Sequence, residues 1–110
     1  MYYINKVSLY NHNNMEIAKT IIEQIRYADK WALMAYGSSN FIALPESKEY
    51  QGGLQFQVNG FQLKGTVRIQ LKWIDTYSIT FINKTEEVIK EVEDVYCDEL
   101  ISILDYIEGK

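Results

Sequence analysis

Residues 65–81 read GTVRIQLKWIDTYSITF, and apolar and polar side chains alternate along this stretch almost without interruption. An alternation with a period of two is typical of β-strands that bury one face. The apolar half, from Val67 to Phe81, therefore predicts a surface that faces a core. Asp75 is a turn residue in the middle of the stretch and predicts a tight turn between two strands. We place these strands at residues 61–74 and 76–82.

Two further strands precede this stretch. The segment LQFQV at residues 54–58 alternates in the same way, and FIAL at residues 41–44 ends at Pro45, which has no backbone N–H for a ladder. Asn59 and Gly60 follow the first of these segments and predict a tight hairpin turn, because both tolerate positive φ. Strands joined by short turns run antiparallel. Residues 1–12 fit either a short edge strand or an ordered arm.

Amphipathic helices are predicted on both sides of the strands. The first covers residues 14–36, with Asn13 or Asn14 as its N-cap and Gly37 as the residue that ends it. Its apolar residues recur at three- and four-residue steps: Ile17, Ile21, Ile25, Ala28, Ala32 and Ala35. The second covers residues 85–108, with Asn83 or Thr85 as its cap. Its apolar stripe is Val88, Val92, Val95, Tyr96, Leu100, Ile103, Leu104 and Ile107.

The predicted fold class is α+β, and the 110 residues suit a single domain. A sheet with one apolar face needs a cover, and two amphipathic helices need a surface to pack on. We therefore expect a two-layer sandwich, with an antiparallel sheet of three to four strands, or at most five, and both helices on one face. The opposite face is then open to water. Its predicted members are Gln55, Gln57, Lys64, Thr66, Arg68, Gln70, Lys72, Ser78 and Thr80.

Charge is distributed unevenly along the chain. The net charge is -4, but residues 1–84 hold nine basic and six acidic residues, whereas residues 85–110 hold two basic and nine acidic ones. The single Cys97 forms no internal disulfide, which is typical of a reducing compartment. The N-terminus does not resemble a signal peptide, and no apolar run is long enough for a membrane span. We therefore expect a cytoplasmic protein without membrane contact.

No group of residues predicts a reaction. Zinc requires three or four converging thiolate, imidazole or carboxylate ligands, and the lone His12 and lone Cys97 lie on different predicted elements. Acidic neighbours, Asp98 and Glu99, disfavour a reactive thiolate at Cys97, which suits a buried or half-buried structural thiol. We expect no metal, no cofactor and no enzymatic activity.

The open sheet face has cations and amides and no acid. Lys64, Arg68 and Lys72 would suit a nucleic-acid backbone, but proteins that bind single strands on a sheet stack bases on aromatic side chains of the same face. The aromatic residues here have the opposite, apolar parity: Phe56, Trp73, Tyr77 and Phe81. Solvated surface is therefore the first interpretation of this face, and contact with a protein or with nucleic acid are the alternatives.

The predicted second helix is strongly acidic. Like charges recur at i, i+4 in Glu87–Glu91 and Asp94–Asp98, a spacing that costs a helix a few tenths of a kcal/mol per pair. Such a surface favours either solubility or docking of a basic protein. Our leading hypothesis is a small non-enzymatic module that docks a partner protein through the outward acids of this helix: Glu87, Glu91, Asp94 and Asp98. Nucleic-acid binding through the open sheet face is the alternative.

Tyrosine is frequent, with nine residues in the chain. Four of them lie in segments outside the predicted core: Tyr2, Tyr3, Tyr10 and Tyr50. Because exposed tyrosine is enriched where proteins meet, we also expect that the chain can self-associate.

Residues 41–82 resemble a pattern found in small proteins carried by phages and conjugative elements. In that pattern a Phe-x-Ala strand precedes a Gly-Leu-x-Phe strand, and an Ile-x-Leu strand leads into Asp-x-Tyr-x-x-x-Phe. The matching positions are Phe41, Ala43, Gly53, Leu54, Phe56, Ile69, Leu71, Asp75, Tyr77 and Phe81. The resemblance implies a mobile-element accessory protein, and it transfers no catalytic or binding residue to this chain.

Overall fold

The computed structural model describes residues 12–110, so the prediction of a strand or an arm at the N-terminus lies outside the described residues. The elements follow in the order α2 (His12–Ala28), α3 (Ala32–Ala35), β1 (Ser39–Leu44), β2 (Tyr50–Asn59), β3 (Lys64–Lys72), β4 (Tyr77–Asn83), β5 (Val88–Val95), η1 (Cys97–Glu99), α4 (Leu100–Leu104) and η2 (Asp105–Glu108). The η elements are short 3₁₀ helices.

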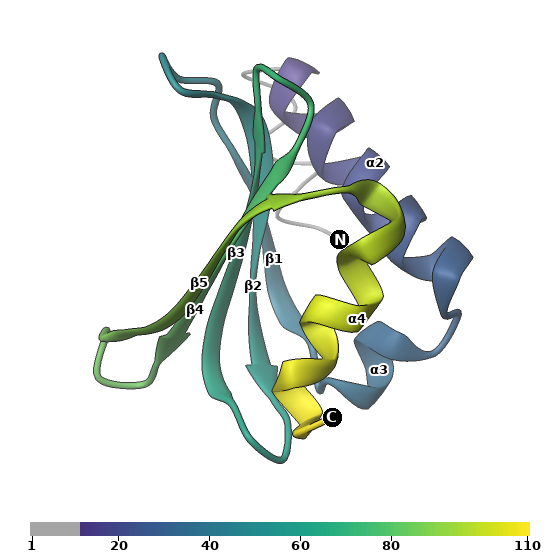
Figure 1. Cartoon of the computed structure of the whole chain (residues 1–110), viewed down its shortest axis with the longest axis vertical. Coiled ribbons are helices and arrows are strands. Elements are labelled where there is room, and N and C mark those ends of the chain that lie inside the picture. The colour runs from purple at the N-terminus through teal and green to yellow at the C-terminus, as the bar shows by residue number, and fades with distance from the viewer. Residues whose placement is uncertain (1–11) are drawn as a thin grey trace.

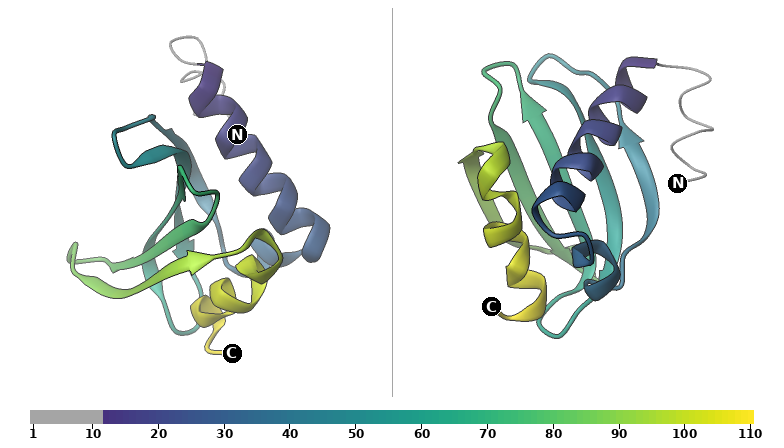
Figure 2. Two further views of the ribbon diagram at one scale, coloured as in Figure 1. Left: turned by 45° about the horizontal axis from the view of Figure 1, so that its top comes forward. Right: turned by 90° about the vertical axis from the view of Figure 1, so that its right-hand side faces the viewer.

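The fold is α+β, as predicted, with the helices on one face of an antiparallel sheet (Figure 1). The five strands are hydrogen-bonded in the order β1-β2-β3-β4-β5, and each strand pairs antiparallel with the next along the chain. The helices α2 and α4 lie beside each other on the same face of the sheet (Figure 2). The other face carries no element of the described chain.

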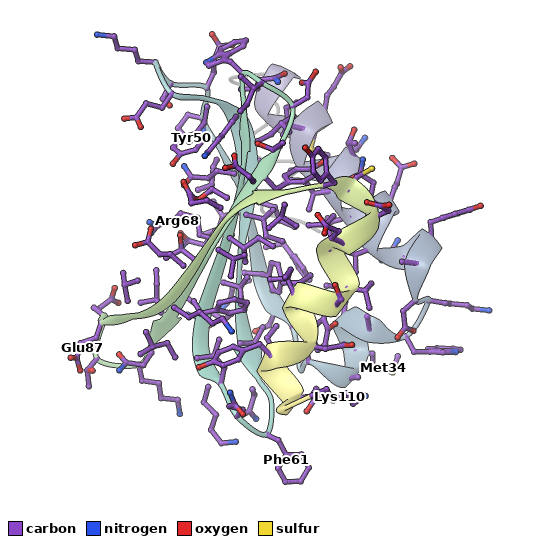
Figure 3. The ribbon with its side chains drawn as sticks, viewed as in Figure 1. Met34, Tyr50, Phe61, Arg68, Glu87 and Lys110 are labelled. Carbon is purple, nitrogen blue, oxygen red and sulfur yellow. The ribbon has the colours of Figure 1, made fainter. Side chains whose placement is uncertain are left out.

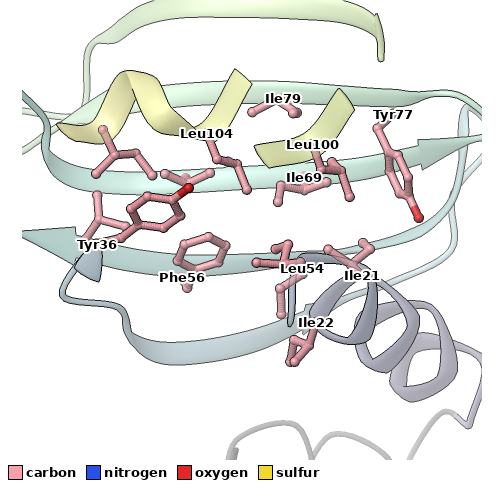
Figure 4. Close-up of a cluster of buried hydrophobic side chains, with 14 of the residues drawn as sticks. Ile21, Ile22, Tyr36, Leu54, Phe56, Ile69, Tyr77, Ile79, Leu100 and Leu104 are labelled. Carbon is pink, nitrogen blue, oxygen red and sulfur yellow. The ribbon is translucent and has the colours of Figure 1, made fainter. Parts of the chain in front are cut away.

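The hydrophobic core fills the space between the sheet and the helices (Figure 4). Ile21 and Ile25 of α2 pack toward the apolar side chains of β2, β3 and β4, while Leu100 and Leu104 close the core from α4. The alternation predicted for the central strands is confirmed, because Val67, Ile69, Ile79 and Phe81 are fully buried.

The first predicted helix, residues 14–36, is two helices instead of one. It begins at His12, so Asn13 and Asn14 lie inside α2 and do not precede it. The break falls at Asp29, whose carboxylate accepts a hydrogen bond from the backbone N–H of Trp31 at 3.0 Å. Such a local side-chain bond competes with the helical pattern. Gly37, with φ of 64°, takes the predicted left-handed conformation after α3.

The second predicted helix, residues 85–108, is wrong over its first half. Residues Val88–Val95 form strand β5, and helical structure begins only at Cys97. The side-chain oxygen of Asn83, predicted as a helix cap, instead accepts the backbone N–H groups of Thr85 (3.0 Å) and Glu87 (2.9 Å) in a hairpin turn. Glu86 in this turn has φ of 68°. The chain therefore reverses and pairs with β4.

The turn between β2 and β3 also differs from the prediction. It is longer than a two-residue hairpin, since β3 begins at Lys64, and neither Asn59 nor Gly60 has positive φ. Gly60 is needed for a close approach: a Cβ there would lie 2.5 Å from both the carbonyl oxygen and Cγ2 of Ile107. At the other end β3 stops at Lys72, so Trp73 lies half-exposed in a turn and not in the predicted apolar layer.

Candidate binding surfaces

Strand β5 brings acidic residues onto the open face of the sheet, next to the predicted cations. Arg68 lies opposite Thr80 in the β3–β4 pair, and Thr80 lies opposite Glu91 in the β4–β5 pair. Residues directly opposite each other in a sheet point to the same face, so Arg68 and Glu91 share the open face two strand spacings apart, about 10 Å. Figure 3 shows Arg68 on the side away from the helices. The open face therefore has both signs of charge.

Lys72 at the end of β3 forms ion pairs with two acidic residues of β5. Its Nζ lies 3.0 Å from a carboxylate oxygen of Glu93 and 3.4 Å from one of Asp94. Hydrogen bonding by Ser78, together with the ion pair to Lys72, lowers the pKa of Glu93. The same bond from the ammonium to Glu93 raises the pKa of Lys72. One of the three predicted nucleic-acid contacts is therefore largely neutralised within the protein.

The other two cations are also engaged locally. The Nε of Arg68 donates to the side-chain carbonyl of Gln55 at 3.1 Å, and Nζ of Lys64 donates to the carbonyl of Gly60 at 2.9 Å. Ser78 and Thr80 are buried although both lie on the open face, where they stand opposite Gln70 and Arg68 of β3. The structure places Lys64, Arg68 and Lys72 on one side of β3, as predicted, but in a surface of mixed charge.

The four acids of the leading hypothesis do not share a helix face. Glu87 lies in the β4–β5 turn (Figure 3), Glu91 and Asp94 lie on β5, and Asp98 lies in η1. Asp94 has φ of 56°, and its carboxylate accepts a hydrogen bond from the hydroxyl of Thr76 at 3.2 Å. This residue therefore shapes the end of β5 in addition to carrying charge.

Acidic residues nevertheless follow the whole β5 edge of the molecule. We call this surface the acidic ribbon, and its seven members are all exposed: Glu86, Glu87, Glu91, Glu93, Asp94, Asp98 and Glu99. Residues 84–99 contain two cations against these seven acids, a net charge of 2 − 7 = −5. Lys90 is directed elsewhere, because its Nζ lies 4.5 Å from the ring centre of Tyr106. Among residues 12–110, Glu86, Glu91 and Asp98 have no ion-pair partner.

A cleft of about 610 Å³ lies between α2 and the start of η1. Its wall is mostly apolar, and it contains Glu23, Gln24, Tyr27, Ala28, Cys97 and Asp98. The hydroxyl of Tyr77 donates to the side-chain oxygen of Gln24 at 2.7 Å and fixes that amide. Burial raises the pKa of Tyr77 to about 12. The cleft is open to solvent at its rim, where Tyr27 is 95% exposed.

Cys97 is exposed in this cleft, which corrects the prediction of a buried or half-buried structural thiol. Sequence reasoning missed the cleft because α2 and η1 are far apart in the chain and were both assigned to uninterrupted helices. Within the described range, no three His, Cys, Asp or Glu side chains come together in a way that could hold a metal ion. No helix of residues 12–110 is long and apolar enough to cross a bilayer.

The fold and these surfaces define a small α+β protein with a mixed-charge sheet face, an acidic edge and an apolar cleft between its helices. No protein-family model, curated protein or solved structure matches the chain.

Proposed function

We propose that this chain is a small non-enzymatic protein-interaction module that docks a basic partner protein on the acidic ribbon. The observation that supports it is the net charge of −5 over residues 84–99, carried by exposed side chains. A patch of one sign steers the association of an oppositely charged partner and discriminates against acidic ones. The resemblance of residues 41–82 to phage and conjugative-element proteins supports a role as a mobile-element accessory protein.

The charge within the protein supports docking on the ribbon over nucleic-acid binding. Lys72 neutralises part of Glu93 and Asp94, whereas Glu86, Glu91 and Asp98 keep uncompensated charge toward solvent. A polyanion approaching Arg68 on the open face would meet the carboxylate of Glu91 on the same face, which costs affinity. Nucleic-acid binding through Lys64, Arg68 and Lys72 therefore remains the weaker alternative.

The experiment compares two variants with the same change of net charge. One reverses two unpaired acids of the ribbon, Glu91→Lys and Asp98→Lys, and the control reverses two exposed acids elsewhere, Glu16→Lys and Glu49→Lys. The wild-type chain is used to isolate a partner from the host cell. That partner is then purified, and its affinity for each variant is measured at low and at high salt.

We expect the ribbon variant to lose about tenfold or more in affinity, which corresponds to about 1.4 kcal/mol, and the control to lose little. The wild-type affinity should fall as salt rises, because exposed charges are screened. A purified partner that binds both variants equally, or whose affinity is independent of salt, would contradict docking on the ribbon.

A further inference from the structure

We propose that the cleft between α2 and η1 receives an apolar side chain from a basic amphipathic helix of the partner. This inference rests on the proposed function and names the form in which the partner binds. The cleft adjoins the acidic ribbon through Asp98, which belongs to both. A helix seated in the cleft would therefore place its basic face beside the ribbon while its apolar face is buried.

The wall of the cleft suits an apolar anchor. The ring of Tyr27 stands at the rim almost entirely in water, and Ala28 and Cys97 contribute small apolar groups beside it. The one amide in the wall, that of Gln24, already accepts the hydroxyl of Tyr77 and is held in place. Exposed tyrosine beside an apolar depression is typical of the residues that contribute most to binding energy.

The acidic residues of the cleft favour a positively charged partner. Glu23 on α2 and Asp98 on η1 stand on its two sides, and no lysine or arginine of residues 12–110 lines it. Two cations close in the sequence to Tyr27 are directed elsewhere, because Arg26 lines a different depression with Ile22 and Lys30 lies 5.2 Å from the ring centre of Trp31. Lysine or arginine one helical turn before and after the anchor would approach both carboxylates.

The openness of the cleft favours a helix over a small amphiphile. Small-molecule sites enclose most of the ligand surface, whereas a ligand seated here would leave Tyr27 at the rim in water. A helix laid along the groove would cover this ring, as in the recognition of amphipathic helices by apolar grooves. The added acids of the ribbon extend the contact beyond a single side chain.

The experiment uses Cys97 as a reporter, because it is the only cysteine of the chain and lies in the cleft. The probe is a cysteine-free amphipathic helical peptide of leucine and lysine. Its matched controls are a lysine–serine peptide of equal charge and a leucine–glutamate peptide of equal apolar pattern. Binding is measured by fluorescence anisotropy, and the rate of Cys97 alkylation by iodoacetamide is measured with and without saturating peptide.

We expect the leucine–lysine peptide to slow alkylation of Cys97 about tenfold. The change Tyr27→Ala should weaken binding of this peptide about tenfold. The matched change Phe61→Ala, at another exposed aromatic residue, should leave the affinity unchanged. The lysine–serine peptide should bind weakly without protecting Cys97, and the leucine–glutamate peptide should not bind.

Three results would overturn the inference. If the leucine–lysine peptide binds and depends on Glu91 and Asp98 while Cys97 stays fully reactive, the cleft proposal fails and docking on the ribbon stands. If neither basic peptide binds at low salt, both proposals fail. If dodecyltrimethylammonium alone protects Cys97 as well as the peptide does, the cleft is a site for a small cationic amphiphile.

Discussion

The contact between Gly60 and Ile107 provides a sharp test of how the C-terminal segment docks on the sheet. A Cβ added at residue 60 would lie 2.5 Å from two atoms of Ile107, one of which is a backbone oxygen that cannot rotate away. That same oxygen accepts the backbone N–H groups of Gln62 at 2.9 Å and Leu63 at 3.1 Å. The change Gly60→Ala must therefore displace η2 from the β2–β3 turn.

The cost follows from the groups that the displacement disturbs. Two backbone hydrogen bonds contribute roughly 1 kcal/mol each, and the fully buried side chain of Ile107 contributes about 1.5–3 kcal/mol through burial. Replacing glycine restricts the unfolded chain and returns about 0.4–1 kcal/mol. Loss of most of these contacts gives a net destabilisation of about 2–4 kcal/mol, or a fall in Tm of roughly 10–20 °C.

Urea denaturation followed by circular dichroism measures the free energy of unfolding of wild type and variant. Phe61→Ala is the control, because this neighbouring side chain is 91% exposed and its removal should change stability by less than about 0.5 kcal/mol. If Gly60→Ala is as stable as wild type, the C-terminal segment does not press on the turn, and the close approach described above is wrong.

Three further outcomes are expected. Burial raises the pKa of Tyr77 to about 12 from 10.0, so the unfolded chain loses this proton first and stability falls between about pH 10 and pH 12. The stability advantage of wild type over Tyr77→Phe, measured by urea denaturation, should therefore shrink over that pH range. A constant advantage would contradict this expectation. The hydroxyl of Ser38 is buried without a hydrogen-bond partner among the described residues, so Ser38→Ala should leave the free energy of unfolding unchanged or raise it by up to about 1 kcal/mol, and a clear loss would reveal a partner. A labelled single-stranded oligonucleotide should show no salt-dependent anisotropy change with the wild-type chain, and binding that is lost in Arg68→Gln would revive the nucleic-acid alternative.

The alternating strands were predictable because their pattern follows from the burial of one face alone. A strand that buries one face needs an apolar residue at every second position, and residues 65–81 satisfy this without help from distant parts of the chain. Gly37 and Asp75 were also predictable, since each takes a positive φ that its local sequence suits. These features depend on neighbours in the sequence.

The sequence correctly indicates that the side chain of Asn83 accepts backbone N–H groups, but it does not indicate that a turn and a strand follow. Its side-chain oxygen accepts backbone N–H groups two and four residues ahead, at Thr85 and Glu87. An asparagine can do this both at a helix start and in a turn. Whether Val88–Val95 forms a strand or a helix depends on two contacts. The free edge of β4 gains hydrogen-bond partners when β5 pairs with it, and Val95 is buried against the core. Neither contact lies within the segment itself, and together they override its local helix propensity.

The break after α2 has a similar origin. Ala28, Ala32 and Ala35 continue the helical spacing, but alanine suits a helix whether or not it faces the core, so these residues say little about burial. Of the three, only Ala32 is buried. The bond from Asp29 to the N–H of Trp31 redirects the chain, and a periodicity of apolar residues does not detect it.

The error at β5 changes the meaning of the acidic residues. On a helix, Glu87 and Glu91 would repel each other at i, i+4, and tolerance of that repulsion was the reason to suspect a partner. In the structure they lie in a turn and on a strand, so that particular repulsion does not arise. What remains is the imbalance itself: Lys72 is the one cation that forms ion pairs with the acids of residues 84–99 in the described chain. On a helix, the i, i+7 spacing of Glu91 and Asp98 would have put both on one face. In the structure Glu91 faces the same side of the sheet as Arg68, and Asp98 stands at the cleft, so the uncompensated charge reaches two surfaces. A single basic partner that spans the edge of the sheet can therefore contact both.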